Sequence, residues 1–373
     1  MQTHTYTVPV EETGWQIPGV ASTVAFTWDY QAGRERMLNL YQKGKDKQWD
    51  AVHRIDWSHD PDPTDQSVAP DEVVPIFGSP TWEKLSRAEK DHVRHHYMAW
   101  TNSQFLHGEQ GALVCSAKIV STVPDIDSKF YAATQTMDEA RHVETYSRFL
   151  HEKLQLAYPI NDSLRSLLDQ TITDPRWDFT YLGMQVMIEG VALAAFSMIR
   201  DFTGDPLAKS INAYVMQDEA RHIAFGRLAL KDAYAELTEP ERAEREEFVV
   251  EASYLLRDRF LAREVWETLG YDADELCRYV DRHQMMTEFR KALFSRVVPT
   301  VKDIGLWGPK VQRAYEDMGV LQFQDLDVQE LSDSDERIAE EVEALVAARA
   351  AGSPAPTGGS RGAEIAATIA AAD

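Results

Sequence analysis

Two copies of the pentapeptide DEARH, at residues 138–142 and 218–222, carry residue types that bind metal ions. Each copy contains Glu-x-x-His, and each follows a single upstream glutamate by 30 residues. The two sets are offset by 80 residues throughout, so chance does not explain the repeat. The candidate ligands are four carboxylates and two imidazoles, at Glu109, Glu139, His142, Glu189, Glu219 and His222.

The spacing of these residues predicts helices that converge on two metal ions. Residues three apart share one face of an α-helix, so each Glu-x-x-His can point both side chains at one ion. Thirty residues allow the chain to climb one helix, turn, and return to the same height on an antiparallel partner. Four such helices carry the ligand set of a di-iron or di-manganese site in a four-helix bundle. Carboxylates with imidazoles suit iron or manganese better than structural zinc or calcium.

The alternative is that the repeated residues lie on solvated helix faces and form ordinary ion pairs. The segments around the two single glutamates, FLHGEQGALV and VMIEGVALAA, are apolar and would bury Glu109 and Glu189. Buried carboxylates without partners are costly, and a metal ion removes that cost. The apolar setting therefore favours the metal site.

The rest of the chain predicts an all-α protein, a four-helix bundle with accessory helices. We divide it into an N-terminal arm and accessory helix (1–85), the bundle (86–236), accessory C-terminal helices (237–330), and an acidic, helix-prone segment with an Ala/Gly/Ser/Pro-rich tail (331–373). The expected helices are 34–55, 86–120, 126–157, 162–172, 178–202, 206–236, 240–269, 272–293 and 309–318, with an extended arm over 1–33 and a loop over 58–80. We expect the last 20 or so residues to be disordered.

Composition narrows the class of protein. The 373 residues carry a formal net charge of −23, which makes nucleic acid and anionic membranes poor partners. The two cysteines, Cys115 and Cys277, are too few for a disulfide framework or an iron–sulfur cluster. The start of the chain does not resemble a secretion signal, and no apolar run approaches the ~20 residues of a membrane span. We expect a cytoplasmic protein.

The repeated Asp-Glu-x-Arg-His resembles the ferritin-like di-iron carboxylate superfamily over about residues 85–235. Within it the chain is most similar to the hydroxylase subunits of bacterial multicomponent monooxygenases, which act on methane, toluene and phenol, and more distantly to the small subunit of ribonucleotide reductase. The resemblance implies a dioxygen-activating di-iron oxygenase that oxidises a C–H, C=C or amine group of a small organic substrate. It implies two iron ions, or a manganese–iron pair, and a homodimer. A separate reductase is expected because the chain lacks a flavin or nicotinamide fingerprint.

The same resemblance suggests roles for residues beside the ligands. It implies that Asp138 orients His222 and that Asp218 orients His142, each across the two halves. Arg141 and Arg221 would balance the charge of these buried aspartates. The alternative for all four is an outward-facing, solvated side chain.

Tyr146 lies one helical turn after His142, so its side chain should approach the metal ions. The radical tyrosine of ribonucleotide reductase occupies the matching position, whereas packing or hydrogen bonding is the simpler role. Small residues beside the ligands can leave room for dioxygen and substrate or allow close helix packing; they are Gly108, Gly111, Ala112, Gly190 and Ala192.

Three other functions stay open. A ribonucleotide reductase-like radical subunit usually has aspartate where this chain has Glu109, and it usually ends in an aromatic docking peptide that is missing here. Arylamine N-oxygenases carry an extra histidine four residues before the second Glu-x-x-His, where this chain has Val215. Ferritin-like iron storage, a non-catalytic function, fits poorly because ferritins are much shorter.

Overall fold

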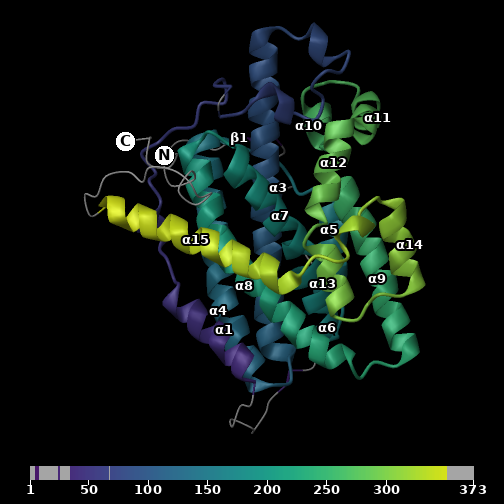
Figure 1. Ribbon diagram of the computed structural model, residues 1–373. Helices are drawn as coiled ribbons and strands as arrows, with labels where there is room; N and C mark the ends of the chain where they lie inside the picture. The colour runs from purple at the N-terminus through teal and green to yellow at the C-terminus, as the bar shows by residue number, and fades with distance from the viewer. Residues whose placement is uncertain (1–4, 8–23, 26–33, 67, 351–373) are drawn as a thin grey trace.

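Two pairs of long helices form the bundle at the centre of the molecule (Figure 1). The computed structural model describes residues 5–7, 24–25, 34–66 and 68–350. The first pair is α3 (Arg87–Thr122) and α4 (Ile126–Arg148). The second pair is a continuous helix made of α6 (Trp177–Tyr181), η5 (Leu182–Ile188) and α7 (Glu189–Phe202), followed by α8 (Pro206–Tyr234). The predicted all-α, ferritin-like bundle with accessory helices is confirmed.

Side-chain caps fix where the bundle helices begin. Ser86 and Glu89 form a capping box at the start of α3, with the Ser86 N–H donating to Glu89 Oε2 at 2.7 Å. Asp125 accepts from the Ser128 N–H at 2.9 Å and starts α4. Asp205 caps α8 in the same way. These caps set the turns between paired helices, and therefore the height at which the ligand residues face each other.

Two stretches of π-helix interrupt helices that we predicted to be regular. The expected helix 126–157 ends as the π-helix η4 (Phe149–Leu154), and η5 lies inside the expected helix 178–202. A π-turn inserts an extra residue into a helix and rotates everything that follows, and such turns are frequent at functional sites. Because η5 ends at Ile188, it sets the direction of the next residue, Glu189.

The expected helix 34–55 is wrong as a single element. It is broken into α1 (Glu35–Asp46) and α2 (Ala51–Arg54). Asp50 causes the break, because its side chain accepts from the N–H groups of Val52 and His53 and so starts a new helix. Residues 47–50 thus leave the helix, while α1 packs against α4 and α8.

The C-terminal accessory helices are also shorter than expected. The predicted helix 240–269 is divided into α9 (Glu239–Asp258), η6 (Arg259–Leu261) and α10 (Arg263–Thr268), because Ala262 adopts a left-handed conformation with φ of 53°. The predicted helix 272–293 is divided at His283 into α11 (Ala273–Arg282) and α12 (Gln284–Leu293), and α13 (Val297–Asp303) was not predicted. The accessory helices α5 (Asp162–Thr173) and α14 (Pro309–Asp317) lie close to their predicted positions.

The remaining elements are short, apart from the last helix. The predicted loop contains η2 (Asp71–Val73), η3 (Trp82–Lys84) lies just after it, and η7 (Leu321–Phe323) follows α14. The two-residue strands β1 (Thr5–Tyr6) and β2 (Leu156–Ala157) pair in parallel. The final helix, α15 (Val328–Ala350), lies across α8 (Figure 1). The predicted disordered tail lies outside the described residues.

One core helix corrects our expectation about apolar runs. The 26 residues Trp177–Phe202 form a helix that is long and apolar enough to cross a membrane by length and composition. Of its most apolar window, 78% is buried inside the bundle. Packing against neighbouring helices therefore accounts for its composition, and the first ligand of the second half lies within it.

Candidate dimetal centre

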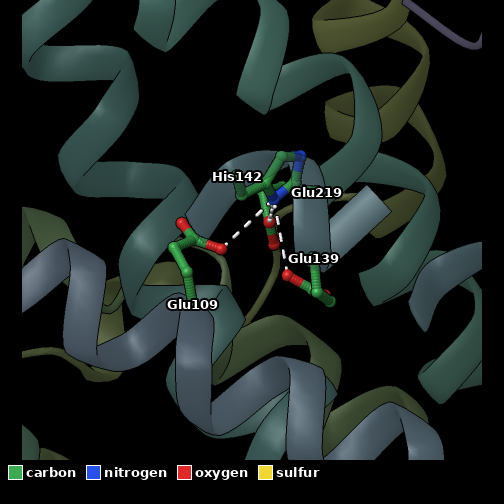
Figure 2. A group of neighbouring side chains, drawn as sticks. All are labelled: Glu109, Glu139, His142 and Glu219. Atoms are coloured by element: carbon green, nitrogen blue, oxygen red, sulfur yellow. Dashed lines mark hydrogen bonds and ion pairs between the residues drawn. The ribbon is translucent and has the colours of Figure 1, made fainter. Parts of the chain in front are cut away.

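The fold brings all six candidate ligands into the middle of the bundle. Glu109 comes from α3, Glu139 and His142 from α4, Glu189 from the first turn of α7, and Glu219 and His222 from α8. All six side chains are buried. Figure 2 shows Glu109, Glu139 and Glu219 around the His142 ring. Ligands that are up to 113 positions apart in the sequence thus share one site.

These side chains form two overlapping groups. In the first group, one ligand atom from each member lies within 4.8 Å of the others; its members are Glu109, Glu139, His142 and Glu219. The second group meets the same limit and consists of Glu139, Glu189 and His222. Glu139 belongs to both groups, so its carboxylate is positioned to bridge two ions.

Both glutamates of the Glu-x-x-His motifs lie between the two imidazoles. Glu139 places Oε2 at 3.4 Å from His142 Nδ1 and Oε1 at 3.1 Å from His222 Nδ1. Glu219 places Oε1 at 3.2 Å from His142 Nδ1 and Oε2 at 3.6 Å from His222 Nδ1. Each carboxylate therefore directs one oxygen toward each half of the site, as the predicted bridging requires.

The cluster has the chemistry of a metal site. Glu139 Oε2, Glu189 Oε2 and Glu219 Oε2 are buried and accept no hydrogen bond from any residue that the structure describes. Burial and the neighbouring Glu219 carboxylate raise the pKa of Glu109 to about 8 and also raise the pKa of Glu189. Buried carboxylates in mutual contact are satisfied by cations, so this arrangement fits two divalent ions.

Each histidine is held by the aspartate of the opposite half. His142 Nε2 lies 3.0 Å from Asp218 Oδ2, and His222 Nε2 lies 3.3 Å from Asp138 Oδ2. These are the pairings that the resemblance implied. We assign the proton to Nε2 in both rings, since the aspartates accept there and Nδ1 faces the glutamates. Each Nδ1 lone pair is then directed at the metal site.

The two arginines of the repeats neutralise these aspartates. Arg141 Nη2 lies 2.7 Å from Asp138 Oδ1 and 2.6 Å from Asp218 Oδ2. Arg221 forms an ion pair with Asp218 and lies 3.9 Å from Asp138 Oδ2. Burial alone would raise the pKa of Asp218, but Arg221, His142 and Arg141 outweigh it and hold the pKa below its ordinary value. Asp218 thus stays ionised as an acceptor.

Two residues that sequence reasoning missed complete this network. Trp49 donates its indole N–H to Asp218 Oδ2 at 2.9 Å. Gln48 donates to Asp138 Oδ1 at 2.7 Å and accepts from Arg141 Nη1 at 2.6 Å. Both lie in the break between α1 and α2, far in sequence from either repeat. Their role depends on that break, which helical periodicity did not reveal.

Helical spacing, by contrast, could have identified Gln135. It lies four residues before Glu139 and therefore on the same face of α4. Its side-chain amide donates to Glu139 Oε1 at 3.1 Å and to Glu189 Oε1 at 2.9 Å. Gln135 also precedes Val215 by 80 residues, the offset of the repeat. One half thus has a polar side chain where the other has a buried valine.

Tyr146 is buried beside the cluster, with its hydroxyl directed at another residue. The phenol donates to Asn212 Oδ1 at 3.2 Å, and its ring centroid lies 5.7 Å from that of Phe105 and 5.9 Å from that of Phe196. Burial, together with the Glu109 and Glu219 carboxylates, raises the pKa of Tyr146 well above 10. The tyrosine stays neutral near the carboxylates.

The small residues beside the ligands have both of the roles that we considered. A Cβ at Gly111 would overlap Leu168, and one at Gly190 would lie 2.9 Å from Val297 Cγ2, so these glycines allow close packing. A Cβ at Gly108 would meet nothing within 4 Å in the described part of the chain, and Gly108 lines a cavity together with Ala112 and Ala192. This metal-side cavity has a volume of about 20 Å³, is also lined by Glu109, Glu189 and Glu219, and has room for about one water molecule.

A larger apolar cavity lies next to the metal-side cavity. Its volume is about 290 Å³, and its walls include Met198, Phe149, Phe260 and Phe289. Phe105 lines both cavities. The phenyl ring of Phe105 therefore stands between the apolar cavity and the metal-side cavity.

Comparisons with known proteins give a family match and several similar solved structures. The family model described as p-aminobenzoate N-oxygenase AurF matches residues 31–305, more than half of the chain. One similar solved structure is an R2-like ligand-binding oxidase with an aerobically reconstituted metal cofactor after photoconversion, with 17% identity, a TM-score of 0.49, and coverage of 75% of this chain and 96% of that one. Another is an R2-like ligand-binding oxidase with an aerobically reconstituted Mn/Fe cofactor, with 19% identity, a TM-score of 0.41, and coverage of 72% and 98%. No curated protein matches the chain.

Proposed function

Because the chain belongs to the p-aminobenzoate N-oxygenase AurF family, we propose that it oxidises the nitrogen of an aromatic amine. At the coarser level the protein is a dioxygen-activating, non-haem di-iron oxygenase that acts on a small organic substrate. The cofactor is a pair of iron ions, with a manganese–iron pair as the alternative. When bound, the ions supply the electrons and the coordination positions that activate dioxygen.

The observation that carries this proposal is the buried pair of ligand groups that share Glu139. Glu109, His142 and the two bridging glutamates would hold one ion. Glu189 and His222, with the same bridges, would hold the other. The aspartates fix the two rings, so the ligands are oriented before the ions bind.

The cavities supply a route and a dry environment for an aromatic substrate. The larger cavity is lined mainly by apolar and aromatic side chains, which suit an aromatic ring. Phe105 separates that cavity from the metal-side cavity, so rotation of its ring would admit the substrate to the carboxylates. The buried rings of Tyr146 and Phe196 exclude water from the same side.

Val215 is a departure from the arylamine N-oxygenase pattern. It replaces the extra histidine of that pattern and is fully buried. The centre in this chain would therefore have six protein side chains as ligands, one fewer than the pattern provides. One fewer imidazole leaves more room for other ligands at the ion beside Glu189 and His222. Nitrogen oxidation thus rests on family membership and the apolar cavity rather than on the complete ligand set.

The remaining parts of the proposal concern the surroundings of the enzyme. We propose a separate reductase as the source of electrons, a homodimer as the assembly, and the cytoplasm as the location. Light scattering of the purified protein measures its mass in solution and so tests the homodimer. Reconstitution with candidate reductases and a measured rate of amine-dependent oxygen consumption tests the electron source.

Product analysis tests the reaction itself. The protein loaded with ferrous iron is supplied with 4-aminobenzoate or aniline, a chemical reductant and ¹⁸O₂, and the products are identified by mass spectrometry. We expect hydroxylamine, nitroso or nitro products that carry ¹⁸O on nitrogen, and their loss in His222→Ala. Products oxidised only on carbon would overturn nitrogen oxidation and leave the oxygenase assignment in place.

A further inference from the structure

Arg259 is a buried cation at the metal-side cavity. The side chain lies at the end of α9, in η6, and the residue is only 7% exposed. Among the residues that line this cavity, all of which the structure describes, Arg259 alone is cationic. Its Nε has no hydrogen-bond partner among the described residues. Burial lowers the pKa of the guanidinium to about 10, so Arg259 remains charged at neutral pH.

Arg259 differs from the other buried arginines of the described chain. Each of the others forms an ion pair with a carboxylate: Arg94 with Asp71 and Asp91, Arg141 with Asp138 and Asp218, Arg200 with Asp201, Arg221 with Asp218, Arg245 with Asp178, and Arg290 with Asp281. No ion pair joins Arg259 to any described residue. A buried charge without a counter-ion is costly, so the fold retains Arg259 at a loss of stability.

The neighbours of Arg259 hold its backbone and supply no counter-ion to its guanidinium. The Asn161 side chain donates to the Arg259 carbonyl oxygen at 3.4 Å, and the guanidinium lies over the ring of Phe260, 5.2 Å from its centroid. Gln104, in the same cavity wall, uses its own amide on the loop after β2: it donates to the Pro159 carbonyl oxygen and accepts from the Asn161 N–H, each at 2.9 Å. The amide in the cavity wall is therefore occupied, while the position of Arg259 is fixed.

The charge of Arg259 is not needed by the metal centre. The four glutamate ligands and the two aspartates carry six negative charges when ionised. Two divalent ions and the paired guanidinium groups of Arg141 and Arg221 carry six positive charges. The loaded centre is thus neutral without Arg259, which leaves one positive charge in the cavity wall for an anion from outside.

We propose that Arg259 binds the carboxylate of the substrate and so selects anionic aromatic amines over neutral ones. This assignment rests on the proposed function, since it takes the metal-side cavity as the substrate site. A guanidinium presents two parallel N–H donors that match a carboxylate, and a desolvated site makes such a pair strong. Glu109 and Glu219 line the same cavity as Arg259, so a substrate anchored at Arg259 would direct its opposite end toward the metal ligands.

Phe105 is part of the same proposal, because the metal-side cavity alone is too small for an aromatic acid. Its ring packs edge-on against Phe196, with 4.7 Å between the centroids. Rotation of Phe105 would join the two cavities that it lines. The aromatic ring of the substrate would then occupy the apolar space, and its carboxylate would pair with Arg259.

A binding experiment that needs no turnover tests the role of Arg259. The iron-loaded protein is titrated without oxygen with benzenesulfonate and with benzenesulfonamide, which differ in charge but hardly in shape; a sulfonate is also a weak ligand for iron. We expect the anion to bind at least tenfold more tightly, the preference to vanish in Arg259→Gln, and part of it to return in Arg259→Lys. Arg257→Gln, two residues away on a side chain that pairs with Asp258, is the matched control and should keep the preference.

Turnover supplies the second measurement. With 4-aminobenzoate and neutral 4-aminobenzamide, Arg259→Gln should raise KM at least tenfold for the acid alone, with little change in kcat. Thermal unfolding checks that Arg259→Gln folds, and its midpoint should equal or exceed that of the unmutated protein. Equal binding of the two sulfur probes by the unmutated protein, or a preference that persists in Arg259→Gln, would overturn the role of Arg259. Failure of nitrogen oxidation would instead appear only in the turnover products.

Discussion

Trp49 and Asp218 are joined by a hydrogen bond of 2.9 Å, from the indole N–H to Oδ2. The same oxygen lies 2.6 Å from Arg141 Nη2 and 3.0 Å from His142 Nε2. Three donors thus converge on one carboxylate oxygen. Because Asp218 in turn fixes the ring of His142, a tryptophan from outside the four bundle helices helps to set the direction of a metal-binding nitrogen.

Replacing this tryptophan should weaken the metal site without removing a ligand. In Trp49→Phe the aromatic packing is kept and the N–H is lost, so Asp218 is held less firmly and His142 with it. We expect the affinity for iron to fall by about 10-fold, at the lower end of such effects. Competition with a chelator of known affinity measures it. Trp57→Phe, whose N–H binds only the Ala51 carbonyl oxygen, is the control, and an equal loss there would contradict a specific role for Trp49.

Each chain should bind two metal ions. We expect iron analysis of the loaded protein to approach two equivalents, and Glu139→Ala, which removes a shared ligand, to lower that number and the stability of the fold. Glu144→Ala, on the same helix but away from the buried ligands, should change neither. Full thermal stability of the unmutated protein with no bound metal would count against the site.

Metal binding should release protons near neutral pH. The pKa of Glu109 is raised from 4.5 to about 8, and that of Glu189 is also raised, so the folded metal-free protein holds protons that the unfolded chain has lost. The stability of the metal-free protein should therefore fall as pH rises from about 4.5 to about 8, by about 1.4 kcal/mol per pH unit for each such group. The raised pKa values of His142 and His222 act in the same direction.

Two measurements check this. Denaturant unfolding of the metal-free protein across that range should give the falling profile, and Glu109→Gln should flatten it. Calorimetric titration with ferrous iron near neutral pH, in buffers of different ionisation enthalpy, should report released protons. Metal-free stability that rises with pH would contradict the raised carboxylate pKa values.

Tyr146 should not carry a stable radical. The oxidising power of the centre is used on the substrate, and the phenol is hydrogen-bonded to Asn212. We expect no long-lived tyrosyl signal in electron paramagnetic resonance after the ferrous protein meets oxygen. Tyr146→Phe should bind two irons, consume oxygen, and lose about 0.5–1.5 kcal/mol of stability with its hydrogen bond. A persistent signal that disappears in this variant would favour the radical subunit.

Two neighbouring glycines should respond oppositely to alanine. In Gly111→Ala the new methyl group overlaps the buried side chain of Leu168, so we expect a loss of about 1–3 kcal/mol. In Gly108→Ala the methyl group enters open space, and the gain in helix propensity should stabilise the protein by about 0.5–1 kcal/mol. Denaturant unfolding of both variants measures the difference, and equal effects would show that the two positions are packed alike.

The parts of the structure that follow from periodicity were predictable. The repeat offset located both helix pairs, and residues three apart on a helix had to share a face, so the ligand set could be assembled from spacing alone. Ser86 and Asp205 have the side chains and positions of helix caps, and the starts of α3 and α8 followed from them.

Interruptions of periodicity were not predictable. The π-helix before Glu189 and the left-handed Ala262 arise because packing between helices outweighs local preference. Arg259 lies shortly before Ala262, in a segment that we expected to be regular helix, so nothing in the sequence indicated that it faces the metal-side cavity. Gln48 and Trp49 escaped notice for the same reason. The residues that tune the centre lie mainly where the helices are broken.

The exchange of aspartates between the two halves has a consequence for how such a protein can be built. Neither helix pair orients its own histidine, because Asp138 serves His222 and Asp218 serves His142. A single helix pair with one DEARH sequence would therefore need a second copy of itself to complete even one metal ligand. The repeat joins two such copies in one chain, so that partners which would otherwise meet by diffusion are supplied in equal number by every molecule synthesised.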